Sequence, residues 1–139
     1  MMEKTLVLIK PDAVQKHHIG DIICRYEQEG FRIIAMKLMQ MTKKVAARHY
    51  EEHIGRHYYD DLEEFMTSAP IVAMVLEGED AIARVRKING KTNPAEADEG
   101  TIRKLFAESA GRNAVHASDS AESAAREIAI FFNATEMYD

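Results

Sequence analysis

Short apolar runs alternate with amphipathic segments along the chain. The first run, Thr5–Ile9, ends at Lys10-Pro11. Because a proline disfavours helical geometry in the residue before it, this run predicts a buried strand. Two further runs, Phe31–Met41 and Ile71–Leu76, and the short stretch Ala114–His116 predict three more strands. The pattern therefore indicates a sheet of four strands.

Segments with helical periodicity separate these strands. Apolar residues recur at intervals of three and four in Gly20–Glu29 and Glu79–Asn89, which predicts two amphipathic helices. Between the second and third strands, Thr42 is a candidate cap for a helix that runs through about Glu52. The segment Asp60–Met66 predicts another short helix before the third strand.

The last third of the chain combines a loop with two helices. Gly90–Gly100 is rich in turn-forming residues and predicts a long loop, and Thr101–Ala107 predicts a short helix after it. Asp119 and Glu122 form a D-x-x-E capping pattern for a closing helix through about residue 132. We expect four residues on the packed face of this helix: Ala121, Ala124, Ala125 and Ile128.

The order of the predicted elements is βαββαβ, with extra helices in the second connection and a terminal helix. This order predicts an α+β fold, a ferredoxin-like sandwich in which helices pack on one face of a four-stranded antiparallel sheet. The chain has 139 residues, of which 46% are hydrophobic. These values predict a single domain over residues 1–139 with a buried core.

The charge balance and the single cysteine exclude several classes of protein. Acidic residues outnumber basic ones 23 to 18, for a net charge of −5, which argues against nucleic-acid binding as a main role. The run Leu6–Ile9 is too short for a signal peptide, and no stretch approaches the ~20 apolar residues of a membrane span. One cysteine, Cys24, is typical of a reducing compartment, so we expect a cytoplasmic protein.

Two motifs match known sites only in part. His49 and His53 lie in an H-x-x-E-H pattern typical of zinc proteases, but Gly55 interrupts the helix and a third ligand must come from elsewhere. We interpret both histidines as exposed helix residues, and a metalloprotease stays a lesser alternative. Gly90–Thr92 resembles the end of a P-loop, but Val85 stands where the first glycine belongs, so we reject that motif.

His116 is the strongest candidate for a chemical role, because it ends a short strand just before a helix begins. Ser118 and Glu127 can reach back and orient its imidazole, as a supporting carboxylate orients a nucleophile. Three cations stand at separate polar junctions, where they can gather around a phosphate: Lys10, Arg86 and Arg103.

The sequence resembles the nucleoside diphosphate kinase family in five motifs that span nearly the whole chain. They are Thr5-Leu6-x-x-x-Lys10-Pro11-Asp12, His49-Tyr50, Thr92-Asn93-Pro94, Gly100–Arg103 and the stretch N-x-x-H-x-S-D-S-x-E-S that begins at Asn113. The last motif is highly specific. The resemblance implies a ferredoxin-like fold, in agreement with the order of the elements.

The resemblance also implies a reaction and a set of site residues. The γ-phosphate of a nucleoside triphosphate passes to His116 and then from phosphohistidine to a nucleoside diphosphate, by a ping-pong mechanism. Glu127 and Ser118 hold the imidazole, and Tyr50 supports the nucleophile. The implied nucleotide ligands are Lys10, Arg86, Thr92, Arg103 and Asn113 for phosphates and sugar, and Tyr58, in place of the usual phenylalanine, for stacking on the base.

The implied cofactor is Mg²⁺, which is expected to arrive on the nucleotide phosphates rather than in a cage of carboxylates. A homo-oligomer is expected, with a tetramer favoured over a hexamer because the chain lacks the long C-terminal extension of some hexamers. The alternative function is a non-catalytic, nucleotide-responsive binding or regulatory module of the same fold. Against it, the chain retains the histidine and every phosphate-binding cation.

Overall fold

Four strands and seven α-helices make up the computed structural model, which describes residues 1–139. The strands are β1 (Met2–Ile9), β2 (Arg32–Met39), β3 (Ile71–Glu79) and β4 (Val115–Ala117). The α-helices are α1 (Pro11–Gln15), α2 (Ile19–Gln28), α3 (Lys43–His49), α4 (Tyr59–Met66), α5 (Ala81–Asn89), α6 (Ile102–Phe106) and α7 (Ala121–Phe131). Three short 3₁₀ helices are η1 (Glu51–His53), η2 (Pro94–Glu96) and η3 (Ala134–Glu136). None of the helices has the length and apolar character needed to span a bilayer.

The strands form one sheet in the order β2-β3-β1-β4, and every neighbouring pair is antiparallel. β1 lies inside the sheet and pairs with β3 along its whole length, from Met2 opposite Glu79 to Ile9 opposite Val72. The short edge strand β4 pairs with the end of β1 and sets His116 opposite Leu8. The predicted four-stranded antiparallel sheet is therefore confirmed.

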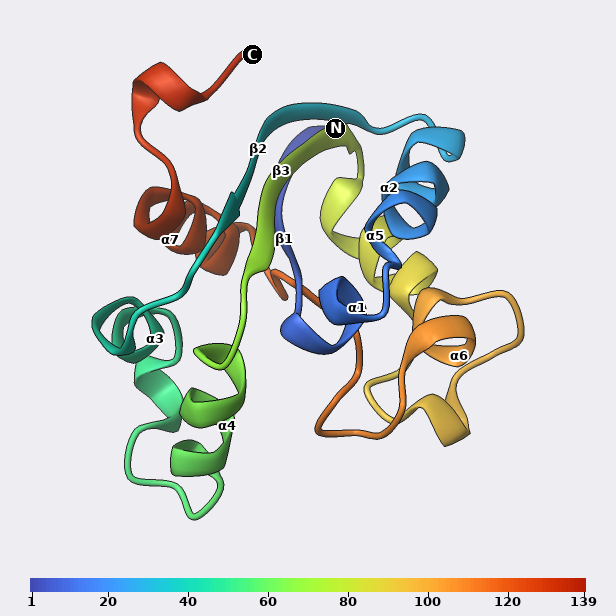
Figure 1. The fold of residues 1–139 in the computed structure, drawn as a ribbon. Coiled ribbons are helices and arrows are strands. Elements are labelled where there is room, and N and C mark those ends of the chain that lie inside the picture. The colour runs from blue at the N-terminus through green and yellow to red at the C-terminus, as the bar shows by residue number, and fades with distance from the viewer.

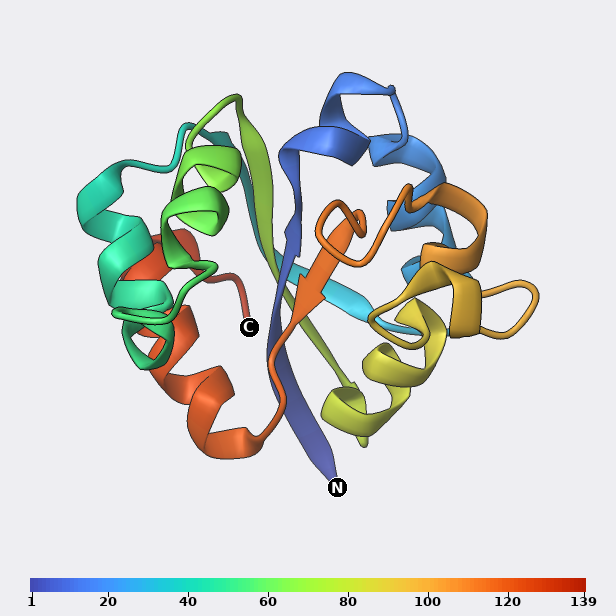
Figure 2. The ribbon, with the colours of Figure 1, turned by 90° about the horizontal axis from the view of Figure 1, so that it is seen from below.

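Helices cover both faces of the sheet, so the prediction of a single covered face is wrong (Figures 1 and 2). Leu6 and Leu8 of β1 pack in one cluster with residues of α3, α4 and α7. Val7 and Ile9 point the other way and pack with residues of α2 and α5. All four are fully buried, as expected for a strand enclosed from both sides. The extra helices of the second connection and α7 supply the second layer.

Helix boundaries depart from the sequence pattern at the end of α3 and at the start of α7. Thr42 caps α3 as predicted, since its side chain accepts a hydrogen bond from the Val45 amide at 3.1 Å. α3 ends at His49, however, and η1 replaces the predicted continuation. At the closing helix the cap is Ser120 rather than Asp119, because the Ser120 hydroxyl accepts from the amide three residues on at 3.0 Å. Aspartate and serine are both common N-cap residues, so the sequence pattern alone does not distinguish Asp119 from Ser120.

The buried face of α7 also differs from the predicted stripe. Ala121 and Ala125 are exposed, whereas Ala124, Glu127 and Phe131 are buried. A carboxylate therefore occupies a position at the centre of the packed face. Apolar periodicity alone does not select this face, because the polar side chain in it is held by specific partners.

One short helix, α1, was not predicted. Pro11 occupies its first turn, where the missing amide hydrogen costs nothing and the fixed φ angle favours a helix. Five residues are too few to show helical periodicity, which is why the pattern did not reveal it. α1 connects β1 to α2, and Lys10, between β1 and α1, lines a large cleft.

The C-terminal tail lies along part of the edge strand β2. The Tyr138 amide donates to the Ile34 carbonyl at 2.7 Å, and the Arg32 guanidinium donates to the Tyr138 carbonyl at 2.5 Å. Beyond this contact the strand carries two exposed apolar side chains, Met36 at 53% and Leu38 at 65% exposure. The second half of the β2 edge is therefore open.

Gly90→Ala should destabilise the fold more than Gly100→Ala. Both glycines have a positive φ, +88° and +84°, so alanine is strained at either position. At Gly90, however, the new Cβ would lie 2.6 Å from the hydroxyl of Thr101, whose side chain caps α6, whereas nothing lies within 4 Å at Gly100. We expect the free energy of unfolding to fall by about 1–3 kcal/mol more at Gly90, the range for overpacking. Denaturant unfolding at one protein concentration measures both, and equal losses would contradict the expected clash.

Candidate active site

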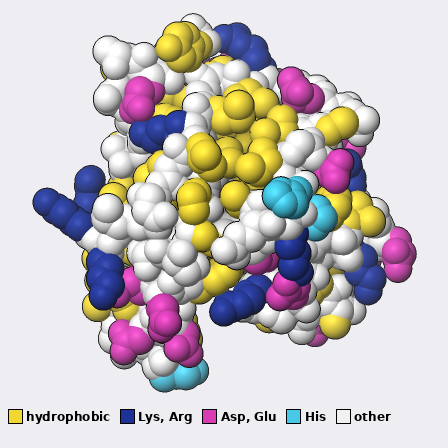
Figure 3. Space-filling model, in the orientation of Figure 1, with side chains coloured by type: hydrophobic (Ala, Val, Ile, Leu, Met, Phe, Trp, Pro, Cys, Tyr) yellow, Lys and Arg dark blue, Asp and Glu magenta, His cyan; other side chains and the backbone are white.

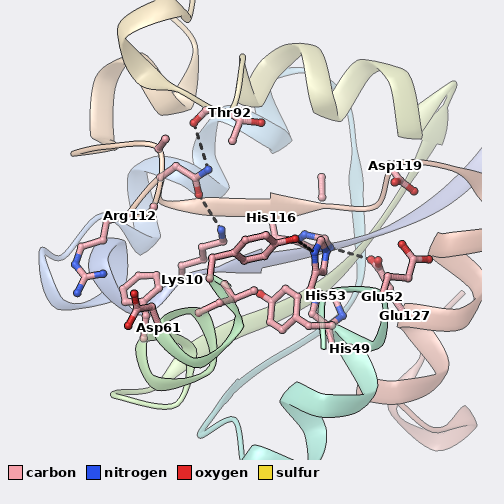
Figure 4. Close-up of a pocket in the computed structure, with 18 of the residues that line it drawn as sticks. Lys10, His49, Glu52, His53, Asp61, Thr92, Arg112, His116, Asp119 and Glu127 are labelled. Carbon is pink, nitrogen blue, oxygen red and sulfur yellow. Dashed lines mark hydrogen bonds and ion pairs between the residues drawn. The ribbon is translucent and has the colours of Figure 1, made fainter. Parts of the chain in front are cut away.

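A cleft of about 1090 Å³ opens between the end of β1, the segment from α3 to α4, and the loop that follows α5 (Figure 4). Ser118 lies behind its wall and is fully buried. The other nine predicted site residues line the cleft: Lys10, Tyr50, Tyr58, Arg86, Thr92, Arg103, Asn113, His116 and Glu127. The fold thus brings together residues that are up to 117 positions apart, from 10 to 127.

A buried carboxylate holds the His116 imidazole. Glu127 Oε1 lies 2.9 Å from His116 Nε2 and accepts a hydrogen bond from the Ser118 hydroxyl at 2.8 Å. The same hydroxyl accepts from the Leu6 amide at 3.2 Å, which joins α7 and β4 to β1. Arg126 places a guanidinium nitrogen 3.8 Å from Glu127 Oε2. These contacts fix the orientation of the ring.

The opposite nitrogen of His116, Nδ1, takes part in no hydrogen bond of the structure, which leaves its lone pair free when the ring is neutral. Burial lowers the pKa of His116 below its ordinary value, although the hydrogen bond and charge of Glu127 act in the opposite direction. The side chain keeps 22% of its surface exposed to the cleft. The lowered pKa favours the neutral form of the imidazole, and the exposed part of the ring is accessible from the cleft.

A tight turn delivers the chain to His116. Ala114 has a φ of +73°, an uncommon angle for a residue with a side chain, and the Val115 amide donates across the turn to the Asn113 carbonyl at 2.9 Å. The buried Asp12 carboxylate stabilises this turn by accepting from the Ala114 amide at 3.0 Å. Asp12 therefore positions this turn. The Lys10-Pro11-Asp12 motif includes the residue but does not reveal this role.

Lys10 reaches into the cleft from the end of β1. Its ammonium donates to Asn113 Oδ1 at 2.8 Å, and Asn113 Nδ2 donates to the Thr92 carbonyl at 3.3 Å (Figure 4). Burial, with a smaller effect of the nearby Arg103 charge, lowers the pKa of Lys10 to about 8. Lys10 is thus a cation that is only partly hydrated, and an incoming anion would stabilise its charge.

The Arg103 guanidinium is partly engaged with the backbone. It donates to the Gly90 carbonyl at 2.7 Å and to the Val115 carbonyl at 2.9 Å, while its Nε is buried without a partner. A guanidinium has five N–H donors, so apart from the buried Nε–H two remain for an anion. Arg86 and Thr92 are exposed on the rim of the cleft, where their side chains are accessible to a ligand.

His49 is buried, so the interpretation of both H-x-x-E-H histidines as exposed is wrong for this residue. It has 4% exposure, and its ring meets His116 edge-on with centroids 4.7 Å apart. Tyr50, 7% exposed, contacts the His49 ring at 4.4 Å. Burial lowers the pKa of His49 far below its ordinary value, so this imidazole stays neutral beside His116. The sequence carried one signal for this arrangement, the His49-Tyr50 motif.

One cluster of side chains could in principle hold a metal ion. It consists of His49, His116 and Glu127, whose ligand atoms lie within 4.8 Å of one another. Two imidazoles and one carboxylate are not the oxygen-rich set that Mg²⁺ prefers. The cluster does not include His53, the other histidine of the H-x-x-E-H pattern, so that pattern does not form the zinc-protease site.

The sequence model of the family described as "Nucleoside diphosphate kinase" matches residues 3–137. The chain belongs to the nucleoside diphosphate kinase family. A nucleoside diphosphate kinase of Listeria monocytogenes serotype 4b (strain CLIP80459) is 53% identical over 136 residues, which cover 98% of this chain and 92% of that protein. One from Methanocaldococcus jannaschii is 52% identical over 139 residues, which cover 100% of this chain and 99% of that protein.

Solved structures of nucleoside diphosphate kinases have the same fold. The enzyme of Aquifex aeolicus superposes with a TM-score of 0.97 at 46% identity and covers 99% of both chains. That of Halobacterium salinarum, in complex with CDP, also has a TM-score of 0.97, at 40% identity, over 100% of this chain and 93% of its own. Membership of the nucleoside diphosphate kinase family makes this chain a phosphotransferase and confirms the resemblance read from the motifs.

Nucleotide affinity should fall as the pH rises through about 8, because only the protonated Lys10 attracts phosphate and its pKa is lowered to about 8. The pKa is about 10.5 in the unfolded chain, so the folded state loses its proton first. The free protein should therefore become more stable over the same range. Calorimetric titration with ADP between pH 7 and 9 measures the affinity. Lys10→Met should bind more weakly at pH 7 and vary little with pH, and a wild-type profile as flat as this control would contradict the prediction.

Proposed function

We propose that the chain transfers the γ-phosphate of a nucleoside triphosphate, mainly ATP, to a nucleoside diphosphate through a phosphohistidine at His116. One observation carries this proposal: Glu127 occupies Nε2 of a histidine that lines the cleft, so Nδ1 is the nitrogen left to attack. Residues 1–139 act as one catalytic domain. Because the lone Cys24 is free and exposed, we propose that the protein resides in the reducing environment of the cytoplasm.

The reaction consists of two in-line displacements at phosphorus. The Nδ1 lone pair of His116 attacks the γ-phosphorus, the bond to the bridging oxygen breaks, and the nucleoside diphosphate leaves with that electron pair. In the second half, a terminal oxygen of another nucleoside diphosphate attacks the phosphohistidine and returns the pair to Nδ1. Glu127 balances the positive charge that develops on the imidazole during attack, and Ser118 holds the carboxylate in place.

The remaining site residues bind the nucleotide. Arg86, Thr92 and the free donors of Arg103 bind the outer phosphates, and the exposed ring of Tyr58 stacks on the base. Lys10 and Asn113, already joined by a hydrogen bond, bind the sugar hydroxyls. Lys10 lines the same cleft as His116, so its ammonium also stabilises the charge of the transferring phosphate. Stacking requires only the face of a ring, which supports acceptance of all common bases.

Members of the family use divalent cations, and we propose that this chain uses Mg²⁺ as part of its nucleotide substrate. The cation neutralises charge on the phosphate oxygens and holds them in line for attack. The acidic side chains on the cleft wall include Glu52, Asp61 and Asp119, which are spread over different elements. This spread supports delivery of the cation by the nucleotide, with the phosphates and water supplying its ligands.

We also propose that the protein forms a homo-oligomer, a tetramer in preference to a hexamer, through the open half of the β2 edge. Figure 3 shows hydrophobic side chains gathered on the face of the molecule along which β2 runs in Figure 1. Met36 and Leu38 are exposed on this strand. Unpaired backbone groups next to exposed apolar side chains favour pairing with a second copy.

Incubation with γ-labelled ATP and Mg²⁺, without an acceptor, should label the protein at about one phosphate per chain. The label should be acid-labile and alkali-stable, as expected for phosphohistidine, and GDP should remove it as GTP. His116→Ala should take no label. His57→Ala, which removes an exposed histidine, should label like the wild type.

Wild-type protein that binds ATP but stays unlabelled would contradict catalysis. The alternative, a nucleotide-responsive regulatory module of the same fold, would then be the better account. A label that persists in His116→Ala would place the nucleophile elsewhere.

Leu38→Lys should break the assembly, because a charge would be buried in the contact. Analytical ultracentrifugation should give about four times the 15.7 kDa chain mass for the wild type and a smaller species for the variant. Ile54→Lys, which changes another exposed apolar residue, should leave the mass unchanged. An assembly that survives Leu38→Lys would exclude this edge as the contact.

A further inference from the structure

One hydrogen bond closes the loop between η1 and α4. The Tyr58 hydroxyl lies 2.5 Å from Nδ1 of His53 and forms a hydrogen bond with it. The four residues between these two in the sequence are all exposed. Within this loop, Gly55 has a φ of +88°, which lets the chain turn back on itself. Both side chains line the cleft, and Figure 4 shows His53 there.

The core of the molecule supports His53 from its other side. Its ring faces Tyr50 edge-on with centroids 6.0 Å apart, and Tyr50 in turn packs against the buried His49. The imidazole thus contacts both a buried tyrosine and an exposed one. A hydrogen bond to His53 therefore ties the exposed ring to a fixed part of the structure.

Tyr58 is an exposed side chain of the cleft wall that such an anchor can restrain. It precedes α4, its side chain accepts no capping hydrogen bond, and 39% of its surface is exposed. An exposed side chain in a loop samples several rotamers, and binding a ligand must restrict them at a cost in free energy. A tyrosine whose hydroxyl is already held loses less freedom when a base stacks on its ring.

We propose that His53 is a positioning residue for the nucleobase, because it holds the Tyr58 ring in the orientation that stacks on the base. The proposal rests on the proposed function, which takes Tyr58 as the stacking ring. The hydrogen bond involves only the hydroxyl at the edge of the ring and leaves its faces free. The gain in affinity is therefore the same for purine and pyrimidine nucleotides and absent for a ligand without a base.

The test is a double-mutant cycle between His53→Leu and Tyr58→Phe, with ADP, CDP and inorganic tripolyphosphate as ligands in calorimetric titrations. Each single variant should bind both nucleotides about three- to tenfold more weakly, the range for one net hydrogen bond. The double variant should bind no more weakly than either single variant. Affinity for tripolyphosphate should not change, since it makes no contact with the ring.

A matched control is His57→Leu. The His57 ring also contacts Tyr58, at 5.3 Å between centroids, but makes no hydrogen bond to it, so nucleotide affinity should stay at the wild-type level. Unchanged ADP affinity in Tyr58→Phe would overturn the proposal, and this variant keeps the ring and therefore the fold. Equal weakening in His57→Leu, or parallel loss of tripolyphosphate binding, would also overturn it, since either would indicate general packing.

The same titrations separate this inference from the proposed function. Labelling of His116 by ATP tests the catalytic proposal separately, in the wild type and in the His57→Leu control, and both should reach full labelling at saturating ATP. Wild-type protein that fails to label would disprove the catalytic proposal and leave the affinity cycle intact. Variants that label fully but show no change in nucleotide affinity would disprove the role of His53 alone.

Discussion

The buried carboxylate of Glu127 is the interaction on which the rest of the site depends. A carboxylate removed from water must be compensated by hydrogen bonds, and here one oxygen serves both His116 and Ser118. Ser118 also binds the Leu6 amide, so the network joins the closing helix to two strands. Orientation of the His116 imidazole and docking of α7 on the sheet are therefore one structural requirement. A change in either would leave a charged group without its partners in the interior.

Much of the fold was predictable because the strands are short, apolar and clearly bounded. The run Thr5–Ile9 lies within β1, and the proline after it marks where the strand ends. The number of covered faces was not predictable from the order of elements, because both a one-layer and a two-layer arrangement satisfy βαββαβ. The sequence signal was the unbroken apolar run in β1, since a strand with one solvent face would alternate apolar and polar residues. In the structure, residues 5–9 are all buried. The apolar run in β1 therefore indicated a sheet covered on both faces as well as the presence of a strand.

The site was predictable to a different degree for each kind of residue. His116, Glu127 and Ser118 were assigned from local spacing, and the structure joins them by hydrogen bonds. His49 was assigned to the surface because a helix pattern says nothing about which other segments pack against it. The environment of His49 comes from β4 and α7, far along the chain. Asp12 shows the same limit, since its partner, the Ala114 amide, is 102 residues away and belongs to a turn that no sequence pattern indicates.

The C-terminal tail has a consequence for the behaviour of the protein in solution. An open sheet edge is a template for strand addition and therefore for aggregation. The Tyr138 amide donates a hydrogen bond to the Ile34 carbonyl on this edge. An ion pair at 3.0 Å between Lys37 and Glu136 holds the tail nearby. The last residues thus act as a protective strap that shortens the edge available to unrelated strands. Colloidal stability of the free chain depends in part on a segment that contributes no residue to the cleft.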